Sequence, residues 1–161
     1  MAEDRTYLKL DGVDGEVTDA KFTKQIQVIG EVTWSVSNMG AGLGAGGASG
    51  ATGGAKADFS DISFMKRVDR TTPVFMQACA TGKHFENAVF SEVETAGDGT
   101  SNLRRETKLT DVMVRSFARS GDVDSVHFTF SKIEYKYIER DSKGKETPHS
   151  AAYDLAKAQK V

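Results

Sequence analysis

Alternating apolar and polar side chains mark the predicted strands of this chain. The clearest run covers residues 26–37, in which five apolar side chains share one parity: Ile26, Val28, Val32, Trp34 and Val36. A period of two predicts a half-buried β-strand whose apolar side faces a core. Gly30 lies on that apolar side, so we expect a bend or a close backbone approach there.

Further strands are predicted between turns rich in glycine, aspartate and serine. They cover residues 6–10, 57–67, 86–94, 103–109, 110–119 and 125–139. In the last of these runs the apolar parity changes, from Val126 and Phe128 to Ile133. A shift by one residue exchanges the two faces of a strand, so we expect a bulge or sharp bend near Ser131-Lys132. A strand bent in this way could serve two sheets.

One short helix is predicted, from Thr72 to Gly82. Thr72 suits the cap, Pro73 suits the first helical position, and Gly82 suits the residue just past the end. Between Val74 and Ala80 only Gln77 is polar, which predicts a helix buried on all sides. The segment Ala151–Lys160 is also helix-prone by propensity alone. Mostly antiparallel strands with one helix indicate a β-barrel or a two-sheet sandwich.

A loop of 17 residues, Gly40 to Lys56, separates the strand at 26–37 from the strand at 57–67. It contains half of the 16 glycines, one large apolar side chain, Leu43, and no charge before Lys56. Ordering each residue costs roughly 1–2 kcal/mol, and this loop has few side chains whose burial could offset that cost. We therefore expect the loop to be disordered, or ordered only against something outside its own domain.

Length and composition fit one soluble domain. The chain has 161 residues, a hydrophobic fraction of 39% and a net charge of −2. No apolar run reaches the roughly 18 residues of a membrane helix, and the charge balance argues against a dedicated nucleic-acid surface. The single Cys79 excludes an intramolecular disulfide and fits a reducing cytoplasm. The amino terminus has no signal-peptide pattern, and we expect no fused toxin after Val161.

Several predicted strands carry charged side chains on one face. These are Arg104, Arg105 and Lys108; Arg115 and Arg119; and Lys132, Glu134 and Lys136. Two interpretations stay open at this point. The charges form either a solvated outer face or the wall of a wide, wet channel shared between subunits.

Two short segments match sequence motifs for nucleotide binding and acyl transfer, but neither lies in the structural context that its motif requires. Residues 42–47 fit G-x-G-x-x-G, but more glycine and then a strand follow, where a dinucleotide site needs a helix. Residues 63–66 fit the S-x-x-K of β-lactamases, but they lie on a strand and the companion motifs are absent. Neither match predicts an active site.

Metal and nucleophile candidates are equally weak. None of the histidines has a zinc-type neighbour, and Cys79 lies within the apolar helix. The histidines are His84, His127 and His149. A group of acidic residues is spaced as in turns, and it lacks the sequence pattern of a calcium-binding loop. Its members are Asp11, Asp14, Glu16 and Asp19. We therefore expect no enzyme, no cofactor and no metal site.

The most specific pattern in the chain covers residues 61–85, which read D-x-S-F-x-K-x-x-D-x-x-T-P-x-F-M-x-A-C-x-x-G-K-H-F. This block closely resembles the Hcp (haemolysin-coregulated protein) family, which forms the inner tube of bacterial type VI secretion systems. Flanking segments are similar in order and position: YLKLDGVDGE, QIQVIGEVTWSVS, LTDVMVRSFARSG, FTFSKIEYKY and AAYDLAKAQKV. The resemblance covers essentially the whole chain.

The resemblance implies a two-sheet β-barrel with one helix, related to phage tail-tube proteins. It implies hexameric rings that stack into a hollow tube, with small effectors as possible cargo in the lumen. The implied partners are a VgrG-type spike protein and a contractile sheath with its baseplate, with no nucleic acid and no membrane. The protein would be made in the cytoplasm and secreted by this machine. The resemblance makes the tail extended, and we follow it because tertiary context overrides helix propensity.

The same resemblance places contacts between rings on the extended loop after the long strand. The candidate contact residues are Met39, Gly40, Leu43, Gly44, Gly47, Gly50, Gly54 and Lys56. A second class of function stays open from the residues alone, namely a small ligand- or carbohydrate-binding β-sandwich module with a mobile loop. Such a module would be monomeric or dimeric, whereas a tube subunit forms rings.

Overall fold

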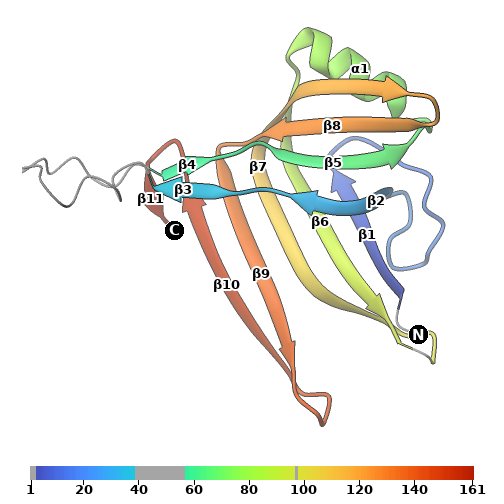
Figure 1. The fold of residues 1–161 in the computed structure, drawn as a ribbon, viewed down its shortest axis with the longest axis vertical. Helices are drawn as coiled ribbons and strands as arrows, with labels where there is room; N and C mark the ends of the chain where they lie inside the picture. Colours follow the sequence, from blue (N-terminus) through green and yellow to red (C-terminus); the bar gives the residue numbers. More distant parts are fainter. Residues whose placement is uncertain (1–2, 39–56, 97) are drawn as a thin grey trace, which may run out of the picture.

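The structure is a computed structural model, and it describes residues 3–38, 57–96 and 98–161. Within these residues the chain forms eleven strands and one helix (Figure 1). The elements are β1 Glu3–Leu10, β2 Ile26–Thr33, β3 Val36–Asn38, β4 Ala57–Phe59, β5 Ile62–Arg67, α1 Thr72–Thr81, β6 His84–Thr95, β7 Ser101–Ser120, β8 Val123–Thr129, β9 Lys132–Arg140, β10 Glu146–Asp154 and β11 Gln159–Lys160.

Six antiparallel strands close into a barrel. The order along the main sheet is β11-β10-β9-β7-β6-β1-β2-β5-β8, and an additional pairing of β7 with β8 joins the ends of the last six. Strands β9, β10 and β11 continue the sheet beyond the barrel. Strands β3 and β4 form a separate two-stranded sheet. The predicted mainly β barrel with one short helix is therefore confirmed.

Strand β7 makes this architecture possible because it pairs with a different strand along each half. Its first half pairs with β9, from Arg105 to Thr110, and its second half pairs with β8, from Met113 to Ser120. Asp111, with φ of 55°, lies between the halves and redirects the strand. The prediction of two strands, 103–109 and 110–119, was wrong, because β7 runs from Ser101 to Ser120 and keeps the same register against β6 on both sides of Asp111.

The predicted change in the parity of the apolar side chains near Ser131 is confirmed. Strand β8 ends at Thr129 and β9 begins at Lys132. The buried side chains change parity from Phe128 to Ile133, as expected for a strand that passes from the barrel to its extension. The tail is extended, in agreement with the resemblance, because all nine residues of β10 pair with β9.

The long strand predicted at 26–37 bends twice. Gly30 has φ of 69°, and the register against β5 shifts between Ile29 and Thr33, so the expected bend at this glycine is confirmed. A second break separates β2 from β3, opposite the break between β4 and β5. There the Ser35 backbone N–H donates to Ser60 Oγ at 2.8 Å, and the Ser60 N–H donates to the Ser35 carbonyl at 2.9 Å. The two strands therefore bend together.

Helix α1 ends as predicted, but it is not buried on all sides. Gly82 is left-handed with φ of 69°, and its N–H donates to the Ala78 carbonyl. Phe75 and Ala78 are buried, whereas the Met76 side chain is 57% exposed, because the helix packs on the barrel with one face only. The cap also differs from the prediction: the N-cap residue is Thr71, with no side-chain cap hydrogen bond.

The core of the barrel is aromatic. Phe64 lies with its ring centre 5.0 Å from that of Phe128 and 5.2 Å from that of Phe90, both in edge-on contacts. Phe75 of the helix lies 6.0 Å from Phe128. Such pairs stabilise beyond the area that they bury, so this cluster fixes α1 to the barrel.

Candidate functional site

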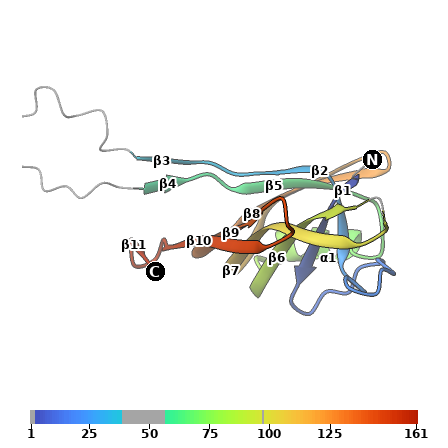
Figure 2. The ribbon, with the colours of Figure 1, turned by 90° about the horizontal axis from the view of Figure 1, so that it is seen from below.

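All eight residues predicted to contact a neighbouring ring, from Met39 to Lys56, lie outside the described residues. The structure does describe the two strands that carry this segment. We call β3 and β4, with segment 39–56 between them, the arm. Its strands leave the barrel as the continuation of β2 and β5, and they pair from Val36↔Phe59 to Asn38↔Ala57. Figures 1 and 2 show β3 and β4 extending away from the barrel.

The base of the arm is held by aromatic contacts with the sheet extension. Trp34 meets Tyr135 of β9 edge-on, at 5.6 Å between ring centres. Phe59 contacts Tyr153 of β10 at 5.5 Å and Phe130 at 6.2 Å. Trp34 and Phe59 are half-buried and pack against the core, as predicted for the lone tryptophan. These contacts fix the direction in which the arm leaves the domain.

A groove opens at the opposite end of the barrel, and we call it the end groove. Its volume is about 620 Å³. Its walls are β1, the loop after it, the bend of β2, and the segment that follows β5. The lining residues are Asp4, Arg5, Glu16, Val17, Gln27, Val28, Ile29, Gly30, Arg67, Val68 and Asp69.

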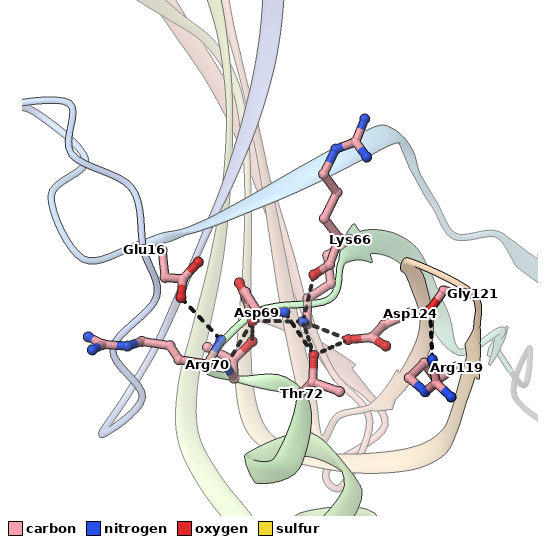
Figure 3. Close-up of polar contacts among 10 residues, drawn as sticks. Glu16, Lys66, Asp69, Arg70, Thr72, Arg119, Gly121 and Asp124 are labelled. Carbon is pink, nitrogen blue, oxygen red and sulfur yellow. Dashed lines mark hydrogen bonds and ion pairs between the residues drawn. The ribbon is translucent and has the colours of Figure 1, made fainter.

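One wall of this groove is anchored by a buried polar cluster, shown in Figure 3. The side chains of Lys66 and Asp124 are fully buried, and Lys66 Nζ donates to Asp124 Oδ2 at 2.8 Å. The same ammonium donates to Asp69 Oδ1 at 3.0 Å and to the Arg67 carbonyl at 3.1 Å. Thr72 Oγ1 donates to Asp124 Oδ2 at 2.6 Å. The cluster thus ties β5 and β8 to the start of α1.

This cluster explains the spacing K-x-x-D-x-x-T in the central sequence block. The three side chains belong to the end of β5, the connecting turn and the first turn of α1, and they meet around one ammonium group. Sequence reasoning missed their partner Asp124, which lies 58 positions from Lys66. A signal was present, because Lys66 and Asp124 are opposite charges on the apolar parity of two strands. A charge on a buried face requires an opposite charge.

The weak chemical motifs gain no support from the described residues. Lys66 is committed to the buried cluster, and Ser63 has the opposite parity on β5, so S-x-x-K forms no catalytic pair. The match at residues 42–47 lies outside the described residues. His84 contacts Asp111 at 2.8 Å and His149 contacts Glu139 at 2.9 Å, both on exposed surfaces. Across residues 3–38, 57–96 and 98–161, no group of three or more potential ligands could hold a metal ion.

The acidic residues after β1 make both local and long-range hydrogen bonds. Asp11 accepts a hydrogen bond from the Asn87 side chain at 3.0 Å, and Asp19 accepts one from the Lys21 backbone at 2.9 Å. Glu16 accepts a hydrogen bond from the backbone of Arg70 at 3.4 Å (Figure 3).

None of the helices in the described part of the chain has the length and apolar character needed to cross a membrane.

The charged strand faces carry charges of both signs. Three ion pairs connect neighbouring strands: Arg104–Glu94 at 2.7 Å, Arg105–Glu92 at 3.3 Å and Lys136–Glu106 at 3.7 Å. A fourth pair, Arg115–Asp61 at 3.3 Å, connects β7 to the break between β4 and β5. All four are at least partly exposed, so each contributes little to stability. A surface of this kind is hydrated and has no dominant sign of charge.

Two carboxyl groups have pKa values shifted in opposite directions. Burial alone would raise the pKa of Asp69, but hydrogen bonds from Thr71 and Lys66 lower it below the ordinary value of 3.8. Burial raises the pKa of Glu92 above 4.5, and Arg105 opposes this only in part. Asp4 and Glu31, two further carboxylates nearby, add to the increase.

These two pKa shifts predict in which direction each carboxyl group changes the free energy of unfolding as the pH falls. Ionised Asp69 stabilises the folded state above its ordinary pKa, and this contribution is lost as the pH falls below about 4. Asp69→Asn should therefore flatten the decline of unfolding free energy in acid, measured by urea denaturation between about pH 3 and about pH 6. Glu92→Gln is the contrast. Protonation of Glu92 favours the folded state as the pH falls, so removing this group should steepen the decline. Equal slopes in both variants would contradict the assignment.

Comparisons with known proteins agree on one family. The family model described as "Type VI secretion system effector, Hcp" matches residues 7–137. A curated relative, Protein hcp1 of Pseudomonas aeruginosa, is 28% identical over 95 residues, which are 55% of this chain and 58% of the relative. The match therefore spans little more than half of that relative's length.

Solved structures share the fold over the full chain. A structure described as that of a type six secretion system protein has a TM-score of 0.86 and 27% identity, covering 99% of this chain and 100% of its own. The crystal structure of Hcp1 from Salmonella typhimurium has a TM-score of 0.77 and 24% identity, covering 100% of both chains. At the latter identity the likeness shows the fold alone.

Proposed function

The chain belongs to the Hcp family of type VI secretion proteins, and from that premise we propose that it is a structural subunit of the secretion tube. Six copies close into a ring, and rings stack head to tail into a hollow tube. The protein performs no catalysis in this role. Its function is to present surfaces that fit other copies of itself.

The observation that carries this proposal is the arm. The barrel has its own core, yet the hairpin formed by β2 and β5 continues past it and ends in a glycine-rich segment with a single large apolar side chain. Such a segment gains little by folding on its own domain. A flexible chain of this length spans roughly 20–25 Å, which is enough to cross a boundary between subunits. Its backbone groups can pair with a strand edge on another copy.

Further partners follow from the same role. We propose that a VgrG-type spike protein tips the tube, that a contractile sheath on a baseplate drives it, and that small effectors travel in its lumen. The hydrated strand faces with charges of both signs suit a wet channel wall, which supports a lumen open to cargo. Secretion then takes place through this machine itself.

Deleting Gly42–Gly54 should leave rings intact and abolish their stacking, because the barrel does not depend on this segment while the contact between rings does. Size-exclusion chromatography reports rings and negative-stain imaging reports tubes. The matched control keeps the length of the segment and its candidate contact residues, and it changes only Ser49 and Thr52 to alanine. Tubes formed by the deletion variant would refute the role of the arm. A 17.4 kDa monomer at every concentration would refute the tube subunit and favour a ligand-binding module.

A further inference from the structure

Strand β10 has an outer edge that is open along most of its length. Its inner edge pairs with β9 over all nine residues. On the outer side β11 reaches only Tyr153 and Asp154, so within the described parts of the chain the edge from Glu146 to Ala151 faces no further strand. Figure 1 shows β10 as the outermost long strand of the sheet extension, with the short β11 near its end. An open edge of this length is a template for pairing with another chain.

Hydrogen bonds at the end of β10 show which backbone groups point to this open edge. The N–H of Val161, which follows β11, donates to the Ala152 carbonyl at 3.1 Å, so the backbone of Ala152 points away from β9. In an antiparallel strand this direction alternates from residue to residue, and the N–H and carbonyl of one residue point the same way. The even-numbered positions of β10 therefore face outward. These are Glu146, Pro148, Ser150, Ala152 and Asp154.

Pro148 occupies one of these outward positions, near the middle of the open edge. Proline has no N–H to donate to an added strand, and its ring fills the place that a partner carbonyl would approach. At Thr147 or His149 a proline would instead remove a hydrogen bond to β9, because the backbone groups there point inward. At position 148 it leaves all nine residues of β10 paired with β9. The proline thus spares the inner ladder and interrupts only the outer one.

Without this proline the edge would suit pairing with a copy of itself. Every residue from Glu146 to Ala151 is exposed, so the strand is accessible from both faces. Other common means of protecting an edge are absent from this stretch. Its register against β9 has no shift, and its one carboxylate, Glu146, is paired with Arg140. Two such edges related by a twofold axis would meet in a self-complementary contact, with the same donors and acceptors on each side.

We infer that Pro148 blocks strand addition at the outer edge of β10, and that without it two copies would pair there, β10 against β10. Strand β11 closes the other end of the same edge by pairing with Tyr153 and Asp154. The inference concerns a contact that the molecule avoids, so it holds whether or not the copies assemble into a tube. For a protein that joins other copies through particular surfaces, an open edge would offer a competing contact.

Substitution of Pro148 tests this role. Pro148→Thr restores the missing N–H and introduces a residue with high β-propensity. Sedimentation velocity of the full chain, at matched concentrations, should then show species larger than any that the wild-type protein forms. Because the variant gains a ladder hydrogen bond and loses a steric clash, its self-association constant should rise on the order of tenfold or more.

The matched control moves the block along the same edge. Pro148→Thr combined with Ser150→Pro again places a proline at an outward position, so it should return self-association to the wild-type level. Thr147→Val raises β-propensity at an inward position and should leave self-association unchanged. Urea denaturation of each variant separates pairing of folded copies from aggregation of unfolded chains. Unchanged association in Pro148→Thr, or equal association in the double variant, would overturn the inference.

Hydrogen exchange of the wild-type protein tests the geometry without any substitution. The amides of Glu146 and Ser150 should exchange much faster than those of Thr147 and His149, because only the latter two point to β9. Slow exchange at all four positions would show that the outer edge is already covered. That result would overturn the inference even if Pro148→Thr failed to fold.

Discussion

Lys66→Met is expected to destabilise the fold by about 3–5 kcal/mol, because it removes one partner from a buried ion pair. Asp124 is fully buried, and its Oδ1 already has no hydrogen-bond partner among the described residues. Without Lys66 the Asp124 carboxylate keeps only Thr72 as a donor, and Asp69 loses its nearest positive charge. The turn that leads into α1 would then be held by far fewer contacts.

The adjacent residue supplies a matched control. Arg67 pairs with Asp122 at 3.2 Å, but these side chains are 73% and 72% exposed. An exposed pair contributes at most about 1 kcal/mol, so Arg67→Met should have a small effect. The double variant Lys66→Met with Asp124→Leu should recover much of the lost stability, since no uncompensated charge remains. Urea denaturation measures all three. A loss below about 1 kcal/mol for Lys66→Met would show that the cluster is not the anchor described here.

Phe128→Ala is expected to lower the free energy of unfolding by about 3–5 kcal/mol, which is the second large effect. Phe128 is fully buried at the centre of the aromatic core, with ring centres at 5.0 Å from Phe64, 6.0 Å from Phe75 and 6.1 Å from Phe90. Removing it leaves a cavity that strands from both halves of the barrel cannot fill by moving together, because their backbone ladders fix their separation.

Met76→Ala is the control for this substitution, because it removes a large apolar side chain that is 57% exposed. Its effect should stay within about 0.5 kcal/mol, as is usual for surface positions. Phe128→Leu should lie between the two variants. Thermal and urea unfolding of the three proteins provide the measurement. Equal losses for Phe128→Ala and Met76→Ala would contradict the central place given to the aromatic cluster.

Much of the local structure was predictable because it depends on neighbours along the chain. The parity of Val126, Phe128 and Ile133 marked the point where β8 gives way to β9. Gly30 marked the bend in β2, and Gly82 marked the end of α1. Each of these features is a property of a few consecutive residues, whose side-chain spacing and backbone freedom already limit the conformation.

The resemblance carried by residues 61–85 pointed to the family, but the sequence did not show what those residues do. In the structure, Lys66, Asp69 and Thr72 stabilise the link between β5 and α1, and the aromatic positions fill the core. The most recognisable part of the chain therefore contains residues that hold the fold together. The predicted contacts between rings lie on segment 39–56, outside the described residues.

By itself the sequence determined where most of the barrel strands lie, which side of those strands is apolar, and where the helix ends. Only the tertiary structure decided that β7 is a single strand shared by β8 and β9, that Lys66 meets Asp124, and that one side of α1 stays exposed. It also placed the arm and the end groove at opposite ends of the domain. The reason is physical: periodicity fixes the face of a strand, whereas its partner depends on packing between residues far apart in the chain.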